Sequence, residues 1–158
     1  MCQMGTERMR ALFVAFLAFI AAFPALAQDR VYEEGQVWAF DVENSGDDNA
    51  LIIQRIEPAE DTGFPYDVYH ISMFVDIPLG EMDELVVGHL PVSRETLDAS
   101  VTETSERDMS TFSDWEEGYR EWQNAKGGVF TIPMDEIVAF LVELMTQQVI
   151  QPKHGSTH

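Results

Sequence analysis

The spacing of hydrophobic residues changes halfway along this chain of 158 residues, and the change limits the folds open to it. In residues 68–75 apolar and polar side chains alternate, as in a strand with one buried face. The apolar face of this expected strand carries Tyr69, Ile71, Met73 and Val75. His70 and Ser72 fall on its other face. Similar patterns predict strands at residues 36–42, 51–57 and 85–90, the first two joined as a hairpin.

The second half of the chain has helical spacing instead. Ser93 is a suitable N-cap for a helix that we expect to run to about Thr104. Residues 113–116 (Ser-Asp-Trp-Glu) match a capping box, which predicts the start of a second helix. Pro133 favours the start of a third helix, because its missing N–H is not needed in the first turn. A short strand is expected before it, at residues 129–132.

The third expected helix is the most apolar of the three. We expect it to be largely buried, because nearly half of its circumference is apolar: Ile137, Val138, Phe140, Leu141, Leu144, Met145 and Val149. The order of all these elements predicts the α+β fold class. The expected architecture is a mainly antiparallel sheet of four to five strands, with two to three helices packed on one face.

The N-terminal segment has the pattern of a cleavable signal peptide. Residues 11–23 are an unbroken apolar run, shorter than the roughly 20 residues that a membrane-spanning helix needs. Pro24 then breaks the run, and Ala25 and Ala27 give the small-x-small pattern that signal peptidase recognises. We therefore expect cleavage between Ala27 and Gln28.

Cleavage at this point would divide the chain into three parts. Residues 1–27 would be removed, residues 28–151 would form a single globular domain, and residues 152–158 would be a flexible tail. The only cysteine, Cys2, lies in the removed part, so the mature chain would have no disulfide, thiol nucleophile or thiolate metal site. The expected location is periplasmic or extracellular, with no membrane span after processing.

The charge of the chain is strongly negative. It has 28 acidic residues against nine basic ones, and a formal net charge of −19. This charge repels the phosphate backbone of nucleic acids, so we exclude nucleic-acid binding. It would attract a basic protein or a cation, although an acidic surface also serves to keep an exported protein soluble. The charge does not determine the oligomeric state.

An aromatic stripe is the most visible feature of the second expected helix. Phe112, Trp115, Tyr119 and Trp122 recur at a 3-4-3 spacing, which places them on one face of that helix. Such a stripe next to strands is usually part of a hydrophobic core. The alternative interpretation is a platform on which sugars or peptidoglycan stack. We predict the core role.

Two groups of residues are weak candidates for metal ligands. The loop after the first expected strand resembles part of a calcium-binding loop, with acidic side chains at Asp41, Glu43, Asp47 and Asp48. The pattern fails at Ile52, where a calcium loop of this kind needs a bidentate glutamate. We therefore predict a plain hairpin turn.

The histidines give the second candidate. His70 and His89 could meet the acids Glu81, Asp83 or Glu84 in a zinc site. Their spacing does not match a ligand pair on one shared element, so we predict no metal site.

The mature sequence lacks the motifs of the common catalysts. It has no Gly-x-Ser-x-Gly, no His-Glu-x-x-His, no phosphate-binding glycine loop and no dinucleotide fingerprint. We predict no catalytic residue and no cofactor. The favoured hypothesis is a non-catalytic binding or interaction module. The alternatives are a cell-envelope hydrolase that uses carboxylates and a histidine, and an inhibitor of a cationic enzyme.

Four short motifs together resemble a group of small, uncharacterised, exported bacterial proteins. They are Tyr-Glu-Glu-Gly-Gln-Val-Trp at 32–38, Gly-His-Leu-Pro at 88–91, Glu-Gly-Tyr-Arg-Glu-Trp at 117–122, and Gly-Val-Phe-Thr-Ile at 128–132. The resemblance covers about residues 31–145 and implies a single compact domain. It implies no activity. The group pattern has more basic residues than this chain, so the strong acidity departs from it.

Overall fold

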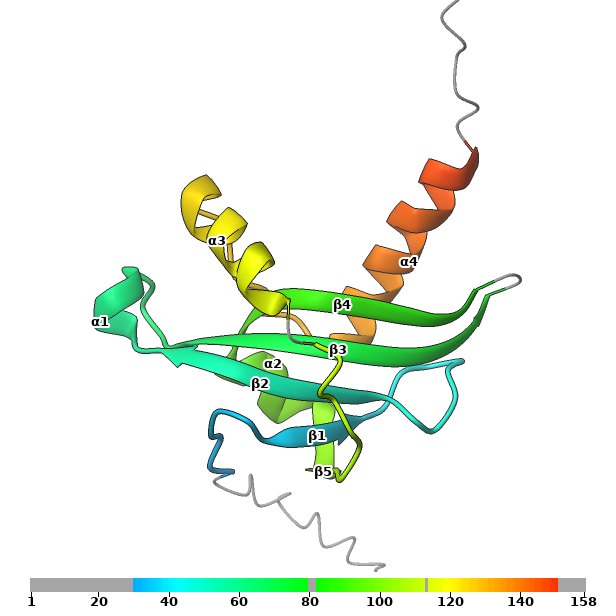
Figure 1. Ribbon diagram of the computed structural model, residues 1–158, viewed down its shortest axis with the longest axis horizontal. Coiled ribbons are helices and arrows are strands. Elements are labelled where there is room, and N and C mark those ends of the chain that lie inside the picture. Colours follow the sequence, from blue (N-terminus) through cyan, green and yellow to red (C-terminus); the bar gives the residue numbers. More distant parts are fainter. Residues whose placement is uncertain (1–29, 80–81, 113, 151–158) are drawn as a thin grey trace, which may run out of the picture.

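The computed structural model describes residues 30–79, 82–112 and 114–150 (Figure 1). The expected signal peptide and its cleavage site at Ala25, Ala27 and Gln28 lie outside these residues. The expected tail at residues 152–158 also lies outside them.

Within the described residues, one sheet has five strands and every neighbouring pair runs antiparallel. The strands are β1 (Val37–Phe40), β2 (Ala50–Glu57), β3 (Val68–Leu79), β4 (Met82–Ser93) and β5 (Val101–Thr104). Their order across the sheet is β4-β3-β2-β1-β5. The helices are α1 (Ala59–Thr62), α2 (Arg94–Ser100), α3 (Trp115–Ala125) and α4 (Met134–Ile150). The predicted α+β class and antiparallel sheet are confirmed.

The hydrophobic core lies on the face of the sheet that β3 was predicted to bury. The side chains of Tyr69, Ile71, Met73 and Val75 are all buried there. Leu97 from α2 and Ile137 from α4 pack into the same core. Burial of this apolar surface is the main stabilising contribution to such a fold, at about 25 cal/mol per Å². Two helices therefore cover this face.

The opposite face of the sheet is covered by α3 and by the segment that precedes it. His70 and Ser72 point to this side and have no exposed surface. The Gln54 amide donates hydrogen bonds to the Ser72 hydroxyl and to the carbonyl of Phe112, which ties the segment to the sheet. Figure 1 shows α3 and α4 diverging as separate arms. We expected the helices on one face of the sheet, and α3 instead covers this second face.

Several element boundaries differ from the expected ones, three of them for a clear physical reason or with a change of element type. The helix expected to reach Thr104 ends at Ser100, and β5 follows it to pair with β1. Val101, Thr102 and Thr104 are β-branched, which favours the extended conformation. β4 continues through Pro91, which an edge strand tolerates because its outer N–H groups need no partner. The strand expected at 129–132 is reduced to an isolated bridge between Phe130 and Val92.

The start of α3 can be compared only in part with the expected capping box. Ser113 of that box lies outside the described residues. The helix begins at Trp115, and Asp114 is its N-cap residue. Its end at Lys126 has a left-handed backbone conformation, with φ of 50°.

The expected burial of α4 is correct for one part of its apolar surface and wrong for another. Ile137 and Val138 are buried, but Phe140 is 48% exposed and Leu144 is 39% exposed. Leu141, Val142 and Met145 further along still pack against the core, so the exposed residues lie on the outer flank of α4, which extends away from the sheet (Figure 1). The side chain of Val149 lies outside the described part. Within the described ranges, no helix combines the length and apolarity that a membrane span requires.

Candidate functional site

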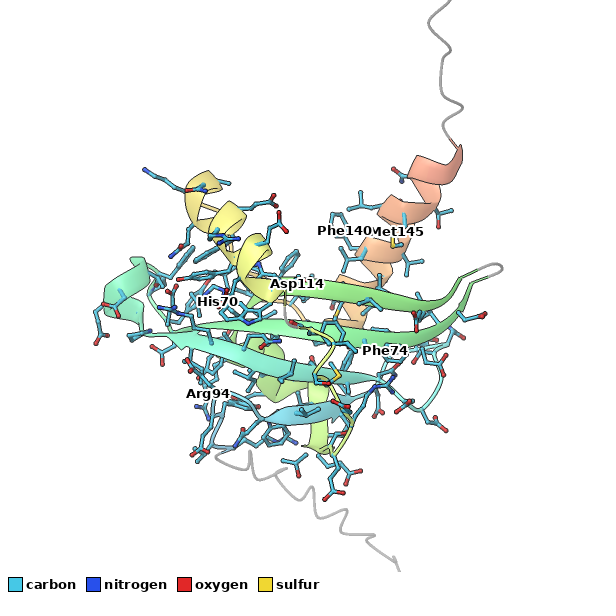
Figure 2. All side chains as sticks on the ribbon, in the orientation of Figure 1. His70, Phe74, Arg94, Asp114, Phe140 and Met145 are labelled. Carbon is cyan, nitrogen blue, oxygen red and sulfur yellow. The ribbon has the colours of Figure 1, made fainter. Side chains whose placement is uncertain are left out.

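A buried hydrogen-bonded network joins three strands to α3. The two histidine rings meet edge to edge, with His70 Nδ1 2.9 Å from His89 Nε2. The other nitrogen of His70, Nε2, lies 3.3 Å from Glu57 Oε2. The Tyr119 hydroxyl donates a hydrogen bond to Glu57 Oε1. Figure 2 shows His70 on the sheet beneath α3.

The strand register explains why these side chains meet. Arg55 of β2 lies directly opposite His70 of β3. Glu57 is two residues beyond Arg55 and so points to the same side of the sheet. His89 comes from β4, the neighbour of β3 on its other edge.

Gly118 allows α3 to pack closely on this network. A Cβ atom at position 118 would lie only 2.8 Å from the Cβ of His89. Any other residue would therefore push the helix away from the sheet. Tyr119, the next residue, and Trp122, one turn further along, point their rings at His70, at centroid distances of 4.8 Å each.

The network defines the tautomers of both histidines. A carboxylate only accepts hydrogen bonds, so His70 Nε2 must carry the proton that it shares with Glu57. His70 Nδ1 is then an acceptor, and His89 Nε2–H donates to it. This leaves Nδ1 of His89 without a proton. That nitrogen is the last atom in the series of hydrogen bonds that begins at Glu57.

Burial keeps both imidazoles neutral near pH 7. Desolvation by burial, with a smaller contribution from the electrostatic interaction with His70, lowers the pKa of His89 to about 4. Desolvation also lowers the pKa of His70, although its hydrogen bond to Glu57 opposes that effect. For the Tyr119 hydroxyl, burial and the Glu57 carboxylate both raise the pKa. The network is therefore held by hydrogen bonds to a carboxylate, and the histidines carry no charge.

Glu57 is the hub of the network. Its carboxylate contacts Arg55 in addition to His70 and Tyr119. The Arg55 Nε lies 3.3 Å from Glu57 Oε1. The Arg55 guanidinium also sits over the Tyr119 ring, 5.1 Å from its centroid. Gln123 donates to the Tyr119 hydroxyl at 2.7 Å. Three donors thus engage the carboxylate, which suits a group that positions other side chains.

A strip of aromatic rings runs outward from this network. Successive rings are nearly parallel, with interplanar angles of 20°, 21° and 26° along the series Tyr66, Phe64, Trp122 and Tyr119. Their centroids are 6.0, 6.4 and 6.1 Å apart. We call these four residues the aromatic strip. Only Tyr119 among them is buried, and the other three are partly exposed.

A cavity of about 400 Å³ lies against the aromatic strip, between α1 and the end of α3. We call it the cup. Its lining residues are Glu57, Asp61, Thr62, Phe64, Trp122, Gln123, Lys126 and Gly127. Trp122 Nε1 donates to the carbonyl of Gly128 at 2.9 Å, which fixes the indole at the wall of the cup. This volume lies in the range of small-molecule sites.

The expected core role of the aromatic stripe applies to part of it. Tyr119 is buried, as expected for a core residue. Phe112, Trp115 and Trp122 are only partly buried, and Trp122 lines the cup. The stripe therefore has two roles. Tyr119 packs on the sheet, and Trp122 faces the cup.

The structure brings two of the zinc candidates together without the expected acids. His70 and His89 are hydrogen-bonded to each other, and their acidic neighbour is Glu57. Asp83 and Glu84 are exposed near the far end of β4, and Glu81 lies outside the described residues. In the described part of the chain, no group of three or more His, Cys, Asp or Glu side chains is arranged to hold a metal ion.

The loop with a partial calcium pattern is organised around an asparagine. The buried Asn49 amide donates to the Ser45 hydroxyl and the Gly46 carbonyl, and its oxygen accepts from the backbone N–H of Asp76. Asp48 forms an ion pair with Arg107. The remaining candidates, Asp41, Glu43 and Asp47, are exposed.

Glu57, Phe64 and Tyr66 are among the site residues that the sequence reasoning missed. Glu57 was expected to end a strand, and its spacing of two from Arg55 was the available signal for a shared face. Phe64 and Tyr66 lie in a turn-rich connection, where periodicity gives no information.

Comparison with known proteins gives no family for this chain. No protein-family model matches the sequence, and no curated protein is similar enough to count as a relative. Motifs at 88–91 and 117–122, which carry the resemblance noted in the sequence, contribute His89, Tyr119 and Trp122 to this site. The functional hypothesis therefore depends on the geometry of the site.

Proposed function

We propose that this chain is an exported, non-catalytic binding module that holds a neutral oligosaccharide in the cup. The observation that carries the proposal is the pair of partly exposed rings, Trp122 and Phe64, next to the Glu57 carboxylate. One face of a pyranose ring is made of C–H groups with partial positive charge. The negative faces of aromatic rings attract such groups. The cup thus offers a sugar both an apolar wall and polar groups.

The polar groups of the cup match the hydroxyls of a sugar. Asp61 accepts hydrogen bonds, Lys126 donates them, and the Gln123 amide can do both. A hydroxyl group can pair with each of these types, because it is donor and acceptor at once. The polar side chains of the cup thus supply donors and acceptors beside the two aromatic rings, a combination that suits a ligand with many hydroxyl groups.

The charge distribution favours a neutral ligand. Locally, the acids Glu57 and Asp61 are balanced by Arg55 and Lys126, so the cup has no strong preference for a cation. The net charge of −19 repels polyanionic ligands. A neutral oligosaccharide satisfies both conditions.

The state of Glu57 favours binding over catalysis. A catalytic carboxylate needs a free lone pair for a proton or a nucleophilic attack. In this chain Tyr119, Arg55 and His70 take up three of the roughly four lone-pair positions of the carboxylate, which leaves little capacity for catalysis. Its role in the proposal is to hold Tyr119 and His70, on which the Trp122 ring packs.

A cell-envelope hydrolase is the second candidate, and one observation favours it. The series of hydrogen bonds from Glu57 to His70 to His89 leaves Nδ1 of His89 as a proton acceptor. A pKa of about 4 makes this nitrogen a weak base at neutral pH, so we rank the hydrolase second. Release of soluble fragments from peptidoglycan, lost in His89→Gln, would favour the hydrolase over the binding module.

The export part of the proposal is supported by the apolar run at residues 11–23 and by Ala25 and Ala27. Intact-mass measurement of the protein from its native host tests it. The expected mature chain begins at Gln28. A full-length chain in the cytoplasm would contradict export.

Isothermal titration with cellohexaose, chitohexaose and maltohexaose tests the binding module. We expect at least one of them to bind with a Kd between about 1 μM and 1 mM. Asp61→Ala should weaken that binding about tenfold or more. Glu60→Ala is the matched control, because Glu60 is an exposed neighbour in α1 that does not line the cup. Binding of none of the three, or equal weakening in both variants, would contradict the proposal.

A further inference from the structure

A second hollow lies on the other arm of the molecule, beside α4. Its volume is about 290 Å³, and it is bounded by α4, the distal part of β3 and the loop after β1. Its floor is apolar, formed by the buried Ile77 and Val138 together with the partly exposed Val42 and Val142. We call this hollow the α4 groove. It shares no lining residue with the cup.

The rim of the α4 groove has a single sign of charge. Glu43, Asp135 and Glu136 line it and are exposed, and all of its charged lining residues are acidic. An apolar floor inside an acidic rim complements a segment with apolar anchors and basic flanks. The net charge of −19 would also steer a basic partner toward the molecule.

We propose that the α4 groove binds a basic amphipathic helix of a partner protein. The apolar anchors of that helix would lie on the partly exposed Val42 and Val142. Its lysine or arginine side chains would pair with Glu43, Asp135 and Glu136. A second copy of this chain is disfavoured as the occupant, because two acidic rims would repel each other. The proposal does not depend on the cup.

The opposite flank of α4 provides an internal control. Phe140 is two residues beyond Val138, so it is rotated by about 200° around the helix axis. It is exposed and does not line the α4 groove, and Figure 2 shows it on α4. If exposed apolar surface on α4 alone attracted the partner, Phe140 would matter as much as the groove.

Fluorescence anisotropy with a labelled synthetic peptide tests the proposal. The probe is a helix of leucine and lysine at amphipathic spacing, about five turns long. Ala139→Arg places a cation in the groove, at an exposed helical position that tolerates arginine well. We expect it to weaken peptide binding about tenfold or more. Glu117→Gln on α3 changes the net charge equally, and Phe140→Ser removes apolar surface outside the groove; each should change the Kd less than about twofold.

The other outcomes are equally specific. Equal weakening by Ala139→Arg and Glu117→Gln would show attraction by the overall charge alone and would overturn the proposal. Equal weakening by Phe140→Ser would overturn it in favour of nonspecific apolar attraction. A dimer in sedimentation that Ala139→Arg dissociates would identify a second copy as the occupant and also overturn it. Trp122→Ala should leave peptide binding unchanged, so the cup and the groove are tested separately.

Discussion

Gly118 of α3 and His89 of β4 are in such close contact that a Cβ atom on the glycine would lie 2.8 Å from the histidine Cβ. Real Cβ atoms almost never approach side-chain atoms so closely, so the helix could not remain in place with a larger residue here. This contact sets the height of α3 above the sheet. It thereby places Tyr119 and Trp122 against His70.

Gly118→Ala should therefore destabilise the protein. Alanine favours a helix by about 1 kcal/mol over glycine, but overpacking a tight contact costs about 1–3 kcal/mol. We expect a net loss in the free energy of unfolding, measured with urea. Gly128→Ala is the control, because a Cβ there meets no atom within 4 Å. A Gly118→Ala variant as stable as Gly128→Ala would show that α3 does not pack as described.

Glu57→Gln tests the hub of the network. The variant retains the shape of the side chain but replaces one acceptor oxygen by an NH₂ group, which cannot accept from His70 or Tyr119. We expect a loss of about 1–3 kcal/mol in the free energy of unfolding. Glu60→Gln, at an exposed position nearby, should change it by less than about 0.5 kcal/mol. Equal effects of the two substitutions would mean that the network adds nothing to stability.

The burial of His89 predicts a pH dependence of stability. The pKa of His89 is about 4 in the folded protein, whereas the ordinary value, which applies in the unfolded chain, is 6.5. Between pH 4 and pH 6.5 the unfolded chain therefore binds a proton at His89 that the folded protein does not bind. The free energy of unfolding therefore falls as the pH drops from about 6.5 to 4. In His89→Gln this contribution is absent, and the amide nitrogen can still donate to His70. Urea unfolding near pH 7.5 and near pH 5 should show a smaller loss in the variant than in the wild type. Identical losses would contradict the buried state of His89.

The acidic loop after β1 predicts a response to salt but not to calcium. Self-repulsion of the net charge of −19 is screened by salt, so Tm should rise with sodium chloride near 0.1 M. Calcium at matched ionic strength should give no further rise, because Asn49 closes the loop and Asp48 is paired with Arg107. Differential scanning calorimetry measures both effects. A calcium-specific rise in Tm that is lost in an Asp47→Asn/Asp48→Asn double variant would contradict this account of the loop.

The sequence was sufficient to predict most of the sheet, because the alternation in β3 records which side chains enter the core. The same alternation correctly separated His70 and Ser72 from the core face. It could not show that α3 covers them, since a pattern gives the face of a strand and not what packs on that face. In the same way, periodicity gave the apolar circumference of α4 but not which part of that circumference packs on the core. That is why Phe140 was wrongly expected to be buried.

The site was harder to predict than the fold because its contacts are distant in the chain. Glu57 is 13 residues from His70 and 62 residues from Tyr119. Its residue type and position in a strand are ordinary, and only the tertiary structure brings its partners together. Trp122 was found in the sequence, but its role depends on Phe64, which comes from a loop near α1.

The indole N–H signals in a ¹H–¹⁵N correlation spectrum test the central claim most directly. The chain has three tryptophans, and of Trp38, Trp115 and Trp122 only Trp122 lines the cup. On titration with the hexasaccharide that binds most tightly, we predict a saturable shift of the Trp122 signal, with the signal of the buried Trp38 unchanged. A titration that shifts the Trp38 or Trp115 signal while the Trp122 signal stays in place would contradict the binding of an oligosaccharide in the cup.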